Sequence, residues 1–70
     1  MDRRAEILMA ERAKRGAMAD RIAVNYPWSA ADILPLTRLT DDEQKIRQTL
    51  DQLLEAGHGI SLALYLLKMP

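Results

Sequence analysis

LTDDEQKIRQTLDQLLEAG, residues 39–57, is the segment in which the beginning, the periodicity and the end all predict the same structure. Thr40 is a favourable N-cap and Glu43 follows three residues later, so the pair predicts a capping box. Apolar residues then recur at the spacing of one helical face: Ile46, Leu50, Leu53 and Leu54. Gly57 suits the left-handed conformation that ends many helices. The segment therefore predicts a helix over residues 40–56.

The length and composition of the chain limit how it can be stabilised. Its 70 residues make one domain, 1–70. A chain of this size buries only about 60% of its unfolded surface. The absence of cysteine excludes disulfides and cysteine-ligated zinc, and the one histidine argues against a histidine metal site. We therefore expect no metal and no cofactor, and we expect a partner, either a second copy or another protein, to supply part of the stability.

Residues 2–24 are rich in alanine, glutamate, arginine and methionine, which favour a helix. Asp2 is the expected N-terminal cap, and Gly16 weakens the helix by about 1 kcal/mol relative to alanine. Two sectors of this helix are distinct. One is a seam of mainly small side chains: Met9, Ala10, Ala13, Ala17 and Val24. The other combines apolar Ile7, Met18 and Ile22 with most of the basic residues. The small-residue seam favours close packing against another helix, whereas the second sector could cover the core or meet an acidic partner.

Residues 25–39 interrupt the helical pattern and predict a linker. Pro27 restricts the preceding residue to extended geometry. Ser29 can cap a short helix over 30–34, with Asp32 in the position usually taken by glutamate in a capping box. Pro35 is expected to end this helix after little more than one turn, or to begin the next one.

The last segment, residues 60–68, predicts a helix because leucine, alanine and methionine outnumber β-branched residues. It would form a helical hairpin with residues 40–56, which completes an all-α fold of a long N-terminal helix, a short helical turn and this hairpin. The segment is apolar almost all round, so three environments are open. The chain itself could enclose it, one side could form an interface with a protein, or it could attach to a membrane surface.

Residues for a protein interface are predicted from this segment and from the loop before the short helix. They are Tyr26, Trp28, Ile60, Leu64, Tyr65 and Met69. Aromatic side chains on loops often dominate binding energy. Trp28 has an alternative role, since a chain without phenylalanine needs one large residue to fill its core.

No pattern of residues predicts catalysis. His58 has no nucleophile or carboxylate near it in sequence, and residues 41–43 point about 100° apart on a helix, so they cannot converge on one metal ion. Nucleic-acid binding is the alternative function, through the basic residues Arg3, Arg4, Lys14, Arg15 and Arg21. The formal net charge of zero argues against it, because nucleic-acid binders usually carry a basic excess.

The sequence therefore predicts a non-enzymatic protein–protein interaction module, such as a small regulator, an inhibitor or an assembly subunit, with a homodimer as one form of association. Its longest apolar stretch, 60–67, is far shorter than the roughly 20 residues that span a bilayer. The N-terminal arginines are not followed by the apolar region of a secretory signal. We expect a cytoplasmic protein.

Overall fold

The structure, a computed structural model, describes residues 3–69, and within them four α-helices follow one another with no strand. The helices are α1 (Arg3–Ala23), α2 (Ala30–Thr37), α3 (Glu43–Ala56) and α4 (Ser61–Lys68). The predicted all-α fold is confirmed. The predicted N-cap at position 2 lies outside the described residues.

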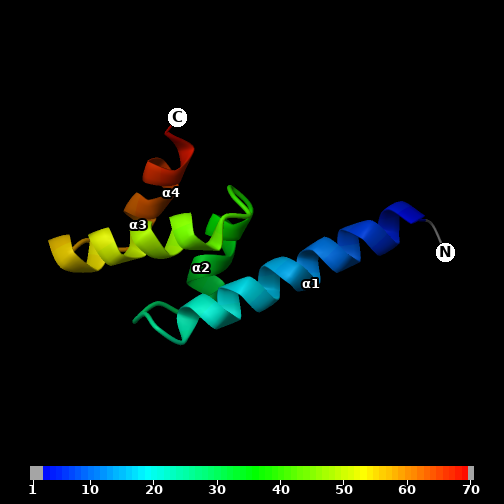
Figure 1. The fold of residues 1–70 in the computed structure, drawn as a ribbon, viewed down its shortest axis with the longest axis horizontal. Helices are drawn as coiled ribbons and strands as arrows, with labels where there is room; N and C mark the ends of the chain where they lie inside the picture. The colour runs from blue at the N-terminus through cyan, green and yellow to red at the C-terminus, as the bar shows by residue number, and fades with distance from the viewer. Residues whose placement is uncertain (1–2, 70) are drawn as a thin grey trace.

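The long helix α1 packs against the rest of the molecule through its C-terminal half. Its buried residues are Met18, Ala19 and Ile22, and Figure 1 shows the N-terminal half extending away from the other helices. This extension makes the molecule elongated, with extents of 47 × 27 × 17 Å.

The side of α1 that packs differs from the small-residue seam that the sequence favoured. The residues of that seam are all exposed: Met9, Ala10, Ala13, Ala17 and Val24. Met18 and Ile22, from the apolar and basic sector, form the packed side instead. The larger apolar side chains of this sector remove more apolar surface from water than alanine does, so α2 packs against them.

The short helix α2 is the centre of the fold. It packs against α1, α3 and α4, and its residues Ile33, Leu36 and Thr37 are almost completely buried. The predicted end at residue 34 is wrong, since Pro35 lies inside the helix. Pro35 is exposed, and the burial of Leu36 offsets the backbone hydrogen bond that proline cannot donate.

The predicted capping box of α2 is confirmed. The side-chain oxygen of Ser29 accepts a hydrogen bond from the backbone N–H of Asp32 at 3.2 Å, and the Asp32 carboxylate accepts one from the N–H of Ser29 at 3.4 Å. Both orphan donors at the start of the helix are thereby satisfied.

The start of α3 lies three residues later than predicted. Asp42 is the N-cap, and its carboxylate accepts a hydrogen bond from the N–H of Lys45 at 3.1 Å. The Thr40 hydroxyl instead accepts one from the N–H of Asp42 at 3.1 Å, within the turn before the helix. Because α2 continues to Thr37, the chain needs residues 38–42 to reverse direction, and the predicted pairing of Thr40 with Glu43 does not form.

The C-terminal end of α3 follows the prediction. Gly57 has a φ of 74°, and the next N–H, of His58, donates to the carbonyl of Leu53 at 2.9 Å. This turn directs the chain back into α4, which packs on α3 and on α2. The core that results is contributed by all four helices: Met18, Ala19, Ile22, Ile33, Leu36, Ile46, Leu50, Leu53, Ala63 and Leu67.

Candidate functional site

The helix α4 rests on the core along one side only. Ala63 and Leu67 are buried, whereas Tyr65 is 67% exposed and Met69 is 63% exposed. Tyr65 lies on the side of α4 away from these buried residues, with half-buried Leu62 about one turn before it and Met69 directly after the last residue of the helix. We call these three residues the α4 outer face. The chain therefore does not enclose this segment completely. Of the three environments that the sequence left open, full enclosure by the chain itself is excluded.

Ile60 and Leu64, which were also predicted to bind a partner, are less exposed than Tyr65 and Met69. Both are half-buried and pack against the core, so they flank the buried side of α4. Tyr26 and Trp28 lie in the loop between α1 and α2, and Figure 1 places this loop and α4 on opposite sides of α3. The structure thus does not gather the six predicted residues into one surface.

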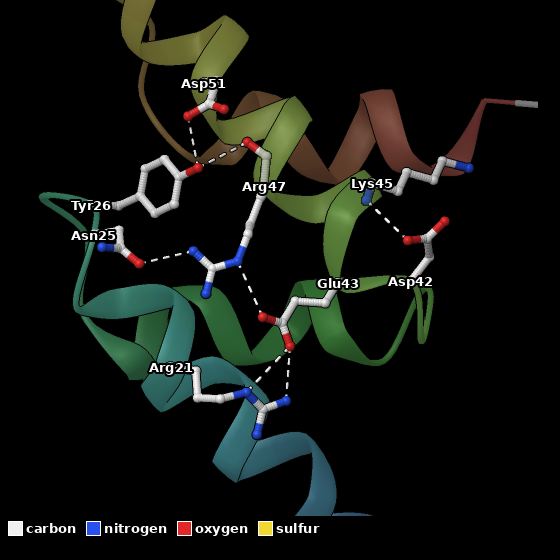
Figure 2. A network of polar contacts seen from close by, with 8 residues as sticks. All are labelled: Arg21, Asn25, Tyr26, Asp42, Glu43, Lys45, Arg47 and Asp51. Atoms are coloured by element: carbon white, nitrogen blue, oxygen red, sulfur yellow. Dashed lines mark hydrogen bonds and ion pairs between the residues drawn. The ribbon is translucent and has the colours of Figure 1, made fainter.

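Tyr26 and Trp28 contribute to the packing of the fold. Their rings stack with centroids 6.2 Å apart and an interplanar angle of 18°, and both contact the core. The Tyr26 hydroxyl donates to Oδ1 of Asp51 at 2.7 Å and lies 3.1 Å from the carbonyl oxygen of Arg47 (Figure 2). Partial burial and the hydrogen bond to Asp51 raise the pKa of Tyr26 to about 12. These contacts give Tyr26 and Trp28 a role in the packing of the fold.

A polar network joins the end of α1 to the start of α3. Nη2 of Arg21 donates to Glu43 at 2.8 Å, and Nε of Arg47 donates to the same carboxylate at 3.1 Å (Figure 2). Nη1 of Arg47 also donates to Oδ1 of Asn25 at 2.9 Å. The hydrogen bond from Arg21, followed by that from Arg47, lowers the pKa of Glu43 below its usual value.

Sequence reasoning missed two features of these sites. The spacing of Leu62, Tyr65 and Met69 could have identified the α4 outer face, but only Tyr65 and Met69 were selected. The i, i+4 spacing of Glu43 and Arg47 predicts their ion pair, whereas the contact of Glu43 with an arginine 22 residues away has no local signal.

The basic residues proposed for nucleic-acid binding lie along α1 without forming one free surface. Arg3, Arg4, Lys14 and Arg21 are exposed and Arg15 is half-buried. Arg21 is held by Glu43, and Nη1 of Arg15 lies 3.8 Å from a carboxylate oxygen of Glu11. Carboxylates therefore neutralise part of this charge.

The described residues show no group of three His, Cys, Asp or Glu side chains that could hold a metal ion. Within residues 3–69, no helix has both the length and the apolar character needed to traverse a bilayer. Comparison of the chain with protein-family models, with curated proteins and with solved structures gave no match.

Proposed function

We propose that this protein is a non-enzymatic interaction protein that binds another protein through the α4 outer face, as a small regulator, an inhibitor or an assembly subunit. The observation that carries the proposal is the exposure of Tyr65, on a helix with few polar side chains, and of Met69 directly after the end of that helix. Tyrosine and methionine are enriched at protein interfaces, where a flat or adaptable apolar side chain provides much of the contact.

The surroundings of the α4 outer face resemble the usual layout of an interface. Leu62 lies between the core and the two exposed residues, so a partner would extend an apolar layer that already exists. Ser61 and Lys68 are polar and exposed on the same helix, and they would lie at the rim of the contact. Each Å² of apolar area covered by a partner would contribute about 25 cal/mol before the costs of association.

Site-specific photo-crosslinking in the cells that express the protein tests this proposal. We expect a photoreactive amino acid at position 65 to capture a protein, and the Met69→Glu substitution to abolish the adduct. The same photoreactive amino acid at position 52, where exposed Gln52 lies on α3, is the matched control and should capture nothing. Equal labelling from both positions, or none from position 65, would contradict the proposal.

The second candidate function is nucleic-acid binding, and one groove favours it. The groove lies between α1 and α2 and is lined by Arg12, Arg15, Leu34 and Arg38, three of which are basic. Phosphate contacts would give binding that weakens steeply with salt. Titration of duplex DNA at two salt concentrations is the test, with Arg12→Ala and Arg38→Ala as the variants expected to reduce binding.

A further inference from the structure

The face of α1 that packs on α2 continues along the helix beyond the part that α2 covers. Met18 and Ile22 are buried in the core. The same face continues toward the N-terminus through Leu8 and Arg4, with the alternating spacing of three and four residues that keeps side chains in line. Figure 1 shows that no other helix accompanies this part of α1.

Four exposed residues lie along this continuation of the face, which we call the arm face: Arg4, Ile7, Leu8 and Glu11. Ile7 is 55% exposed and Leu8 is 51% exposed, although both are large apolar side chains. Glu11, 3.8 Å from Arg15, retains a side chain that is 54% exposed. The arm face therefore has an apolar centre with a basic residue on one side and an acidic residue on the other.

The order of these residues makes the arm face complementary to a second copy of itself. When two such helices lie antiparallel, Ile7 of each meets Leu8 of the other, and Arg4 of each meets Glu11 of the other. Both ion pairs are then attractive. A parallel arrangement would place arginine against arginine and glutamate against glutamate, which is repulsive.

We propose that two copies of this protein associate through antiparallel pairing of their arm faces. The helices would overlap over about ten residues, or roughly 15 Å. Figure 1 shows α2, α3 and α4 gathered at the C-terminal part of α1, away from its N-terminal end. In an antiparallel pair the two bodies would therefore lie at opposite ends of the overlap. This interface is separate from the α4 outer face, and it places two copies of that face at opposite ends of one particle.

The contact is short, so the dimer is weak and depends on protein concentration. Sedimentation equilibrium over a dilution series measures it directly. We expect Arg4→Glu and Glu11→Arg, tested singly, each to weaken association by about 10-fold, because each change makes both ion pairs repulsive. Circular dichroism of each variant verifies that the helices are retained.

Combining the two changes discriminates between arrangements. The double variant carrying Arg4→Glu and Glu11→Arg restores both ion pairs with their charges exchanged. Its association constant should therefore return to within about 3-fold of that of the unsubstituted protein. A mixture of the two single variants should likewise form mixed dimers. Lys45→Glu and Glu55→Arg, charge reversals at exposed positions on α3, are the matched controls and should not change association.

Three results would overturn the proposal. One is a monomer at every concentration tested, and another is a dimer that the single charge reversals do not weaken, as a parallel arrangement predicts. The third is failure of the double variant to recover. Met69→Glu, which tests the proposed function, should leave the dimer unchanged, so failure of one proposal is distinguishable from failure of the other.

Discussion

The phenolic oxygen of Tyr26 lies 2.7 Å from Oδ1 of Asp51, and this contact fixes the loop between α1 and α2 against α3. The two residues are 25 positions apart in the chain. The adjacent carbonyl of Arg47, 3.1 Å from the same hydroxyl, gives a second acceptor on the same helix. The loop is thus attached to α3 through side chains, since the hydrogen bond from Arg47 to Asn25 lies beside that of Tyr26.

Removing the Tyr26 hydroxyl should weaken the fold while leaving the aromatic stack in place. We expect Tyr26→Phe to lower the free energy of unfolding by about 1 kcal/mol, the usual net value of one such hydrogen bond. Urea unfolding followed by the fluorescence of Trp28, the only tryptophan in the chain, measures this change. Tyr65→Phe, at an exposed position, is the control and should have little effect.

The same contact predicts a loss of stability at alkaline pH. The pKa of Tyr26 in the fold is about 12, against 10.0 for an ordinary tyrosine, so both states keep the proton below pH 10. Between pH 10 and 12 the unfolded chain loses its proton first, and stability therefore falls as the pH rises. Ultraviolet titration should show a tyrosine that ionises near pH 12 and disappears in Tyr26→Phe; its persistence there would contradict the assignment.

Glu43 predicts the opposite dependence at acid pH. Arg21 and Arg47 lower the pKa of the Glu43 carboxyl below the ordinary value of 4.5. The contribution of this carboxylate to the free energy of unfolding is therefore complete above pH 4.5, and it is lost as the pH falls through the folded pKa. Its side chain is 30% exposed, so we expect Glu43→Gln to cost about 1 kcal/mol or less at pH 7.

Urea unfolding at pH 7 and pH 3 measures this effect. The difference in stability between the original chain and Glu43→Gln should be smaller at pH 3. Glu55→Gln is the control, because Glu55 is exposed and lies near the other end of α3. A difference that is unchanged between the two pH values would show that Glu43 acts by packing rather than by charge.

The features that the sequence predicted are those set by neighbouring residues. The capping box of Ser29 and Asp32 spans three residues, and the left-handed Gly57 ends a helix whose periodicity is local. The buried face of α3 was likewise predicted, except that Leu54 is exposed and that Thr49, which is buried, was not included. In each case the interacting groups lie within a few residues, so short-range rules identify them.

The features that the sequence did not predict depend on contacts between distant segments. The length of α2 is one, since the local cost of Pro35 is offset by the burial of Leu36 against other helices. The packed side of α1 is another, because two sectors of that helix were compatible with burial and only contact with α2 selects one. The same holds for the candidate site. The exposure of Tyr65 follows from how few helices surround α4, which no local pattern specifies.

Two isoleucines on α1 should differ sharply in their importance for stability. Ile22 is completely buried, whereas Ile7 lies on the part of α1 that no other helix covers. We expect Ile22→Ala to cost about 2–5 kcal/mol, which approaches the total stability of so small a protein, and Ile7→Ala to cost about 0.5 kcal/mol or less.

Thermal unfolding at a concentration too low for association compares these two variants. Ile22→Val is a milder companion that should remain folded and lose about 0.5–1.5 kcal/mol. Equal losses from Ile22→Ala and Ile7→Ala would mean that the N-terminal half of α1 is packed rather than extended.

The turn before α4 contains two glycines with different requirements. Gly57 has a φ of 74°, a conformation that costs a residue with a Cβ about 1–2 kcal/mol, although nothing lies within 4 Å of the added atom. Gly59 has no positive φ and equal space around it. Gly57→Ala should therefore lower the free energy of unfolding by about 1–2 kcal/mol. Gly59→Ala should be neutral or stabilising by up to about 1 kcal/mol, since alanine restricts the unfolded chain. Urea unfolding of both variants measures this contrast. An equal loss of stability in Gly59→Ala and Gly57→Ala would show that the turn into α4 depends on both glycines rather than on the left-handed residue alone.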